Sequence, residues 1–475
     1  MKKVLCYLLS VLLVLPMIAS CANKDNTDNT TTLNKDLNDL TPEELYGEYN
    51  LDGQEFVLLI EQRETPYNEF HAEPDEGEGD VINDAIYQRF MRVQDLLKCK
   101  VEVLDTEDRY SIGTTLRDSI TAGTSDYDAA LLGYSLPTVF SDRYLCDLNT
   151  VSTMNLSADW WDQNAIQDFT INNHLYVATG DISYVNLQGS MIIYFNKQIT
   201  ASSKLPNLYD MVRNNQWTMD KLNEYSTLCT AELTGDDNLT TDDQVGFVGE
   251  ATAMSYFFNA AGERTIYNDG TSLTISPITN RFIKAIEAYS DLVGNSAIAL
   301  HDVNYPNSPI TAFSEGRIAF LCDAVYKSPV LRNMDTDFGI LPMPMLNDTQ
   351  ESYYTPVNYY WASYAVIPSN NTRIDDTGVL LDAFAYYGYK LTRPAVYEAS
   401  FDSKIARDED SREMMDMILA STTYDIGWLF DFGGLRGYFS SFGNVRKPSV
   451  SRTMKGAQKT IKDDMDAMLE QLFAS

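Results

Sequence analysis

The chain has 475 residues and is strongly acidic, with 68 acidic against 35 basic residues and a formal net charge of -33. This balance argues against a nucleic-acid partner, because phosphate contacts need a basic surface, and against adsorption to anionic lipid. Apolar residues make up 44% of the chain and aromatic residues 12%, which is ample material for a core. A chain of this length exceeds one compact core, so we expect at least two domains.

The first residues have the pattern of an export signal that ends at a cysteine. Two lysines precede an apolar stretch over residues 4–18. That stretch is too short to cross a bilayer but has the length of a secretory core region. The small residues before Cys21 resemble the bacterial lipobox, in which the cysteine is diacylated and becomes the new N-terminus. We therefore expect a signal peptide over 1–20 and a polar, lipid-anchored tether over 21–50; an ordinary signal peptide containing a cysteine is the alternative.

Strand-like and helix-like patterns alternate through the rest of the chain. Apolar runs of strand length are at residues 55–60, 101–104, 127–132, 191–195, 318–321, 338–341 and 364–367. Apolar residues with helical spacing predict helices at 82–97, 111–122, 207–214, 218–230, 278–293, 377–391, 394–400, 411–420 and 455–473. Thr218 is expected to cap the helix that it precedes. The alternation predicts βαβ units and a parallel sheet, in which ligands lie at the carboxyl ends of the strands.

Metal and redox motifs are missing from the sequence. The cysteines outside the leader are Cys99, Cys146, Cys229 and Cys322. Their wide spacing favours buried free thiols over a disulfide framework, although an exported protein can form disulfides. The chain lacks HExxH, paired CxxC and GxSxG motifs, which argues against zinc enzymes and serine hydrolases. We expect no cofactor and no metal site.

One acidic stretch has some features of a calcium loop. Residues 232–243 place oxygen donors near several EF-hand positions. However, Asp237 stands where the tight turn needs glycine, and Glu232 stands where aspartate is usual. A solvated acidic loop is the favoured interpretation, with bound calcium as the alternative.

Eight segments together resemble a known family. They are Trp160-Trp161-Asp162, Leu175-Tyr176 before Gly180-Asp181, Tyr194-Phe195-Asn196-Lys197, Leu208-Tyr209 with Trp217-Thr218, Ala312-Phe313-Ser314-Glu315-Gly316, Gly339-Ile340-Leu341-Pro342-Met343-Pro344, Ile367-Pro368 and Arg407-Asp408-Glu409-Asp410-Ser411. Each is weak alone, but their order and spacing over roughly residues 55–430 resemble the family 1 extracellular solute-binding proteins. These are the sugar-receptor subunits of bacterial ABC importers.

The resemblance implies an α/β, two-lobed periplasmic-binding-protein-like fold of type II with a ligand cleft between the lobes. One lobe would comprise residues 54–187 plus 358–420, and the other residues 188–357 plus 421–475. The protein would be a monomer without enzymatic activity. Its partners would be a carbohydrate, the membrane permease subunits of an ABC importer, and the bilayer through acylated Cys21.

Candidate ligand residues follow from where the resemblance places the loops between the lobes. Aromatic rings stack on the faces of a sugar, and polar side chains pair with its hydroxyls. The chain has 30 Tyr, 20 Phe and 5 Trp, of which most must be core. The candidates are Glu61, Arg63, Tyr134, Ser135, Asp181, Tyr184, Tyr256, Phe257, Asp323, Tyr326, Tyr359, Tyr360, Trp361 and Trp428.

Two classes of function compete at this point. The first is a receptor that captures a carbohydrate, in particular an oligosaccharide, and presents it to a permease. The second is a secreted, lipid-anchored glycoside hydrolase, which needs two carboxyl groups about 5–5.5 Å or about 6.5–9.5 Å apart. No motif places such a pair, so the receptor is favoured. The same fold could also bind a peptide, a polyol or a phosphorylated compound, although the low basic content disfavours anions.

Overall fold

The computed structural model describes residues 35–61, 69–70, 81–106, 108–140, 143–305, 308–401 and 409–473. Cys21 and Arg63 lie outside these residues. Of these residues, 35–40 belong to one unit and 41–473 belong to a second, compact unit. In the first, a short 3-10 helix, Leu37–Asp39, is capped by the Asp36 side chain. All that follows concerns the second unit.

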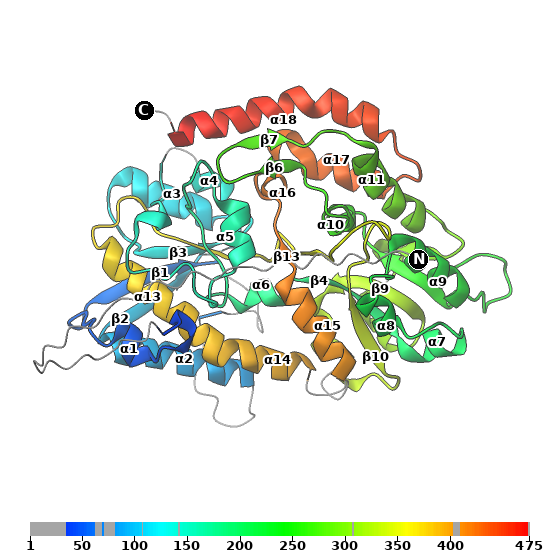
Figure 1. Ribbon diagram of the computed structural model, residues 1–475, viewed down its shortest axis with the longest axis horizontal. Helices are drawn as coiled ribbons and strands as arrows, with labels where there is room; N and C mark the ends of the chain where they lie inside the picture. The colour runs from blue at the N-terminus through cyan, green and yellow to red at the C-terminus, as the bar shows by residue number, and fades with distance from the viewer. Residues whose placement is uncertain are drawn as a thin grey trace, which may run out of the picture. The chain divides into compact units, whose positions relative to one another are not determined.

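The first sheet has four strands in the order β12-β3-β1-β2 (Figure 1). They are β1 (Glu55–Ile60), β2 (Lys100–Asp105), β3 (Ala129–Leu132) and β12 (Tyr364–Val366). β1 is parallel to β2 and β3, with helices α2 (Val81–Leu97) and α3 (Ile112–Ala122) as the crossovers. β12 joins β3 antiparallel, from much later in the chain.

The second sheet has five strands in the order β10-β4-β9-β5-β8. They are β4 (Met191–Asn196), β5 (Val245–Gly249), β8 (Ala299–His301), β9 (Ile318–Ala324) and β10 (Phe338–Pro342). β5 is parallel to β8 and β9, whereas β4 is antiparallel to β9 and β10. Both sheets are therefore mixed rather than purely parallel. β4 is the first strand after the chain leaves the first sheet, and β12 is the strand that returns to it from the second sheet. Neither is joined to a neighbouring parallel strand by a βαβ crossover.

The remaining elements surround these sheets. The other helices are α1 (Pro42–Tyr46), α4 (Pro137–Phe140), α5 (Gln163–Phe169), α6 (Tyr184–Gln188), α7 (Lys197–Ser202), α8 (Leu208–Arg213), α9 (Met219–Cys229), α10 (Ala253–Ala260), α11 (Asn280–Val293), α12 (Pro309–Ser314), α13 (Ile374–Tyr387), α14 (Arg393–Phe401), α15 (Glu409–Ala420), α16 (Ile426–Phe430), α17 (Leu435–Gly443) and α18 (Val450–Phe473). Short helical turns are η2 (Leu148–Thr150), η3 (Asp302–Asn304), η4 (Val325–Asn333), η5 (Gly388–Thr392) and η6 (Phe432–Gly434). Two small ladders pair β6 (Ile266–Asn268) with β7 (Leu273–Ile275), and β11 (Thr355–Pro356) with β13 (Thr422–Thr423). Thr218 caps α9 as predicted, because its hydroxyl accepts the Lys221 N–H.

Two segments that connect the sheets run next to each other. Ser190 bridges Val357, and the Asn358 N–H donates to the Gly189 carbonyl at 2.9 Å. On α6, Asn186 accepts the Ser363 N–H at 2.7 Å and donates to the Ser363 carbonyl at 2.9 Å. Both side chains are buried. The outward and return connections are thus joined into one hydrogen-bonded unit.

A third connection leaves α14 and enters α15. Helix α15 packs against β10 and α8, and the hydroxyls of Tyr209 and Ser411 lie 2.8 Å apart. Next along the chain, β13 pairs with β11. In Figure 1, α6 and α15 lie between the strands of the first sheet and those of the second. Elements from distant parts of the sequence therefore meet around these connections.

Asp382 on α13 is the polar centre of the core beside the first sheet. It is fully buried, and its oxygens accept the Tyr46 hydroxyl at 2.8 Å and the indole N–H groups of Trp160 at 3.0 Å and Trp161 at 2.7 Å. The side chain and backbone of Asn155 also donate to it. The tryptophan pair is thus held inside the core.

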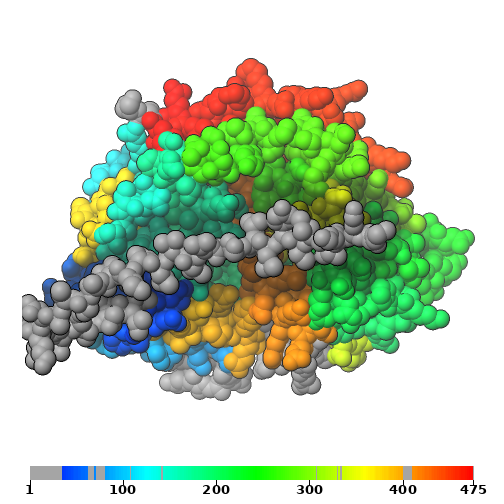
Figure 2. Space-filling view, viewed as in Figure 1, coloured from blue at the N-terminus to red at the C-terminus, as the bar shows by residue number. Residues whose placement is uncertain are grey.

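The β6–β7 hairpin reaches the segment that follows α5. Asn268 donates from its side chain to the carbonyls of Asp168 at 2.8 Å and Thr170 at 2.9 Å, and the Asn173 N–H donates to the Gly270 carbonyl at 2.8 Å. The space-filling view shows these parts in contact on one face (Figure 2).

Candidate functional site

The carboxyl ends of strands from both sheets carry polar and aromatic side chains. Glu61 directly follows β1, and Tyr134 follows β3 two residues on. In the second sheet, Glu250 follows β5, Asp302 follows β8, and Asp323 lies near the end of β9. Ligands of open α/β sheets bind beyond these strand ends. This edge is therefore where a solute site is expected.

A row of tyrosine rings runs across this edge. Tyr134 and Tyr360 are stacked, with centroids 4.9 Å apart and planes within 6°. Tyr359 lies 4.7 Å from Tyr360, and Tyr256 lies 6.2 Å from Tyr359. At the outer end, the 60% exposed Tyr110 meets Tyr134 edge-on at 5.8 Å. We call Tyr110, Tyr134, Tyr360, Tyr359 and Tyr256 the tyrosine row.

Arg436 on α17 lies against two rings of the row. Its guanidinium carbon is 4.3 Å from the Tyr134 centroid and 4.8 Å from that of Tyr359. The same guanidinium donates to the carbonyls of Trp428 at 2.7 Å and Leu429 at 2.8 Å, which fixes its position. The cation thus links the residue after β3 to the α16–α17 segment.

Arg109 occupies the first-sheet side of the edge. Its guanidinium lies 3.9 Å from the buried Glu61 carboxylate and 5.4 Å from the Trp361 ring, and it donates to the Tyr360 carbonyl. Glu61 also accepts the Gly133 N–H at 2.6 Å. Among the described residues, two buried polar atoms near these strand ends find no hydrogen-bond partner, Arg109 Nε and Ser135 Oγ. Buried polar atoms are normally paired, so both suit a ligand hydroxyl.

Carboxylates occupy the second-sheet side. Burial raises the pKa of Asp323 to about 7, against the opposing effect of Lys327. Burial also raises the pKa of Glu250, and its charge and that of Asp302 act on Asp323 in the same direction. Lys327 Nζ lies 4.7 Å from the Tyr326 centroid, and Tyr326 lies 5.2 Å from Trp361. These groups offer both donors and acceptors beside aromatic rings.

The structure brings most of the sequence candidates together and separates a few. Glu61, Tyr134, Tyr256, Asp323, Tyr326, Tyr359, Tyr360 and Trp361 belong to this edge, with the buried Trp428 behind it, where its indole donates to Asn259 at 2.6 Å. Tyr184 instead packs in the core with Ile86, Val185 and Val396, and Phe257 is stacked on Tyr289 at 4.4 Å. Ser135 is buried at this edge, whereas Asp181 lines a separate cavity.

Several residues of the edge were not predicted from the sequence. They are Arg109, Tyr110, Glu250, Asp302, Lys327 and Arg436. Glu250 and Asp302 follow β5 and β8, two short strands that the apolar pattern did not reveal. Recognising these strands would have pointed to both carboxylates, because residues after parallel strands gather at one edge.

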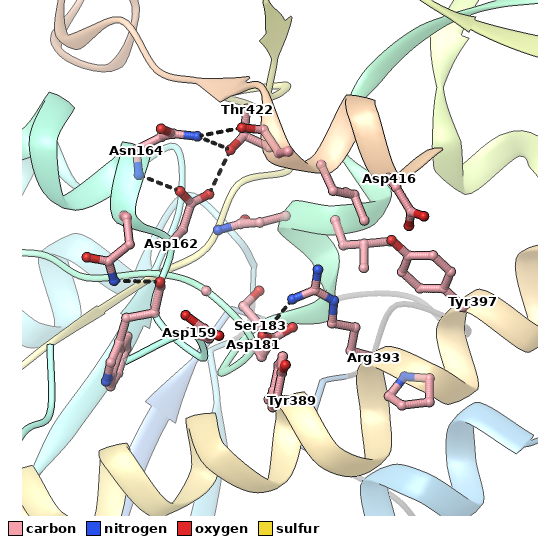
Figure 3. Close-up of a pocket in the computed structure, with 18 of the residues that line it drawn as sticks. Asp159, Asp162, Asn164, Asp181, Ser183, Tyr389, Arg393, Tyr397, Asp416 and Thr422 are labelled. Carbon is pink, nitrogen blue, oxygen red and sulfur yellow. Dashed lines mark hydrogen bonds and ion pairs between the residues drawn. The ribbon is translucent and has the colours of Figure 1, made fainter. Parts of the chain in front are cut away.

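A cavity of about 10 Å³ lies beside Tyr256, Tyr359 and Trp428. A much larger one, about 890 Å³, lies elsewhere, between α5, α6, α14 and α15 (Figure 3). The stacked rings of Tyr134 and Tyr360 leave no room for a ligand between them.

The acidic stretch of residues 232–243 uses its carboxylates internally. Glu232 accepts the N–H groups of Thr234 at 2.8 Å and Gly235 at 2.6 Å. Asp243 accepts those of Leu233 and Thr240, both at 2.7 Å. In the described parts of the chain, no group of three or more His, Cys, Asp or Glu side chains is placed to hold a metal ion. Cys99, Cys146, Cys229 and Cys322 are free thiols.

Comparisons with known proteins place the fold. No family model and no curated protein matches the sequence. Among solved structures, the chain is similar to the cyclic α-maltosyl-1,6-maltose binding protein of Arthrobacter globiformis, with a TM-score of 0.58, 12% identity, and 87% of this chain and 99% of that chain covered. It is also similar to the ABC substrate-binding protein Lmo0181 of Listeria monocytogenes in complex with cycloalternan, with a TM-score of 0.52, 13% identity, and 88% and 98% covered.

A third similar structure is UgpB of Mycobacterium tuberculosis in complex with glycerophosphocholine, with a TM-score of 0.55, 17% identity, and 81% and 96% covered. The chain has the two-lobed α/β fold of the solute-binding proteins of ABC transporters, as expected from the sequence. Within the described residues, no helix is long and apolar enough to span a membrane.

Proposed function

We propose that the protein is an extracytoplasmic receptor that captures a neutral carbohydrate, in particular an oligosaccharide, and delivers it to the permease of an ABC importer. It does no chemistry of its own. The observation that carries the proposal is the tyrosine row with carboxylates and arginines beside it, at the carboxyl ends of strands from both sheets. Solved relatives in fold that bind cycloalternan and cyclic α-maltosyl-1,6-maltose support the choice of solute.

We assign one of the two sheets to each lobe. We place residues 54–187 and 358–401 in one lobe and residues 188–357 and 409–473 in the other. Compared with the sequence expectation, α15 moves to the second lobe, because it packs on β10 and α8.

Ligand entry between the stacked rings requires Tyr134 or Tyr360 to move. A flat ligand sandwiched between two rings needs about 7–8 Å between them, since each contact takes about 3.5–4.0 Å. Tyr134 and Tyr360 are only 4.9 Å apart. A sugar must therefore part these rings, and it can favour the ligand-bound arrangement only by binding it more tightly than the alternative.

The membrane anchor belongs to the same proposal. Cys21 would carry the acyl chains, and the polar residues after it would form the tether. Labelled palmitate should enter the wild-type protein in a bacterial host and be absent from Cys21→Ala. Labelling of the variant would contradict lipidation at this residue.

Calorimetry with a panel of oligosaccharides, including cycloalternan and maltotetraose, tests the binding function. At least one should bind, and Tyr360→Ala should weaken it at least tenfold. Tyr267→Ala is the matched control, because Tyr267 is 58% exposed on β6 and lies away from the row. The products should contain no shortened glycan. Turnover of the sugar, or equal affinity in all three proteins, would overturn the proposal.

A further inference from the structure

A second cavity lies apart from the tyrosine row. It measures about 890 Å³, within the range of small-molecule sites, and is lined by the start of α5, by α6, and by α14 and α15 (Figure 3). No residue of the tyrosine row lines it. In the space-filling view the surfaces of α14 and α15 lie next to each other, in neighbouring shades of orange (Figure 2).

A carboxylate–guanidinium pair lies at the centre of this cavity. Arg393 donates from its guanidinium to Asp181 at 3.3 Å, and Figure 3 shows both side chains in the middle of the view. Burial raises the pKa of Asp181 to about 7, while Arg393 acts to lower it. Asp181 is thus a desolvated acceptor, and among the described residues Arg393 is its charged partner at hydrogen-bonding distance.

The walls alternate between hydrogen-bond donors and acceptors. On one side, Asp162 accepts the Thr422 hydroxyl at 3.1 Å, and Asn164 donates to Thr422 at 3.1 Å. On the other, Tyr397 and the exposed carboxylate of Asp416 flank Arg393 (Figure 3). A purely anionic or purely cationic guest would meet a like charge on one wall. Hydroxyl groups can both donate to the carboxylates and accept from the guanidinium and amide.

We propose that this cavity is a second binding site, specific for a small neutral polyhydroxylated solute such as a sugar or sugar alcohol. It is separate from the cleft of the proposed function and does not depend on it. Asp181 and Arg393 would orient the hydroxyls, and the apolar side chains of Leu187 and Leu419 would contact the carbon skeleton.

The helices that form the walls also couple solute binding in this cavity to the relative position of the two lobes. Helix α14 packs on α2, beside the first sheet, and also on η4, whereas α15 packs on β10 of the second sheet. A solute that touches both helices therefore binds differently when the helices move relative to one another. Its affinity must depend on the position of the lobes, and the dependence is reciprocal.

Two variants close or alter the cavity without touching the tyrosine row. Ala420→Trp fills the space from α15, and Asp181→Asn removes the central charge while keeping the shape. Ala201→Trp is the matched control, because Ala201 is exposed on α7 and does not line the cavity. Circular dichroism and melting curves establish that each variant folds. Asp181→Asn keeps the test valid if the tryptophan does not fit.

The probes are D-mannitol and a set of neutral mono- and disaccharides, with inorganic phosphate and putrescine as charged comparators. Calorimetry should find a neutral probe whose binding falls at least tenfold in Ala420→Trp and Asp181→Asn, and stays within twofold in Ala201→Trp. Tyr360→Ala should retain it as well, which separates this site from the cleft.

The proposal is overturned if no neutral probe binds, or if binding is unchanged in both cavity variants. Tighter binding of phosphate or putrescine at this cavity overturns the chemical class. If sugar binding responds to Tyr360→Ala and ignores the cavity variants, the proposed function stands and this site fails. If sugar binding responds to the cavity variants and not to Tyr360→Ala, the cleft of the proposed function is contradicted and the cavity site stands.

Discussion

The guanidinium carbon of Arg436 lies 4.3 Å from the centre of the Tyr134 ring. Tyr134 follows β3 of the first sheet, and Arg436 lies on α17, which packs with α10 and α11 beside the second. A cation–π pair at a partly desolvated site contributes about 1–2 kcal/mol. Arg436 therefore helps to hold the two lobes together at the mouth of the proposed cleft.

Loss of this contact should loosen the lobes. Without ligand, Arg436→Ala should increase the radius of gyration measured by small-angle X-ray scattering, and lower the melting temperature by a few degrees. Arg452→Ala, an exposed arginine on α18, is the control and should change neither. An unchanged scattering profile in Arg436→Ala would show that Arg436 has no role in closure.

Stability should depend on pH through Asp323. Its folded-state pKa is raised to about 7 from 3.8, so this group favours folding below about pH 4 and loses that contribution as pH rises through 7. In Asp323→Asn the loss cannot occur. We therefore expect the free energy of unfolding of Asp323→Asn, relative to that of the wild type, to rise by roughly 1–3 kcal/mol from pH 5 to pH 8. Urea melts at both pH values measure the gain, and parallel pH profiles for the two proteins would disprove it.

The Asp382 centre should be essential for stability. Asp382→Ala leaves the Tyr46 hydroxyl and two indole N–H groups buried without their acceptor. Each unpaired group costs about 1–3 kcal/mol, so we expect a loss of at least 3 kcal/mol, or failure to fold. Asp375→Ala, an exposed residue at the start of the same helix, should cost less than about 1 kcal/mol. Chemical denaturation compares the two.

The four cysteines should remain reduced and react slowly. Burial raises the pKa of the thiols of Cys99 and Cys146 to about 11, so little thiolate exists at neutral pH. A thiol reagent such as DTNB should modify them fully only in denaturant, and dithiothreitol should leave the melting temperature unchanged. A drop in melting temperature on reduction would reveal a disulfide.

The sequence predicted the long elements well. All seven strand-length runs and all nine helices that it predicted are present, with ends shifted by a few residues. β1 matches residue for residue, because an uninterrupted apolar run between polar residues leaves one interpretation. The order and spacing of the eight segments that resemble the solute-binding family then predicted the two-lobed fold.

The short strands were not predicted from the sequence because their local residue propensities disfavour a strand. β5 contains Gly246 and Gly249, which weaken a strand pattern. Both are required by close packing: a Cβ on Gly246 would lie 2.1 Å from the Ser226 carbonyl oxygen, and one on Gly249 would lie 2.7 Å from the Tyr289 hydroxyl. Such contacts with α9 and α11 exist only in the tertiary structure, so the sequence pattern could not predict Glu250 at the site.

Single aromatic residues could not be assigned for a similar reason. Phe257 and Tyr256 are neighbours in α10, yet Phe257 stacks on Tyr289 whereas Tyr256 reaches Tyr359. Which of two adjacent rings faces a cleft depends on the rotation of the helix about its axis, and α10 is buried on all sides. No polar face therefore marked its orientation in the sequence.

The antiparallel pairing of β12 with β3 has a consequence for biosynthesis. During synthesis from the N-terminus, β1, β2 and β3 emerge together, but their last partner, Tyr364–Val366, comes only after the whole second sheet. Until then β3 has an open edge that can pair with other chains. A nascent or truncated form that stops before residue 364 should therefore be prone to aggregate and depend on chaperones, and folding should finish late because this pairing is so distant in sequence.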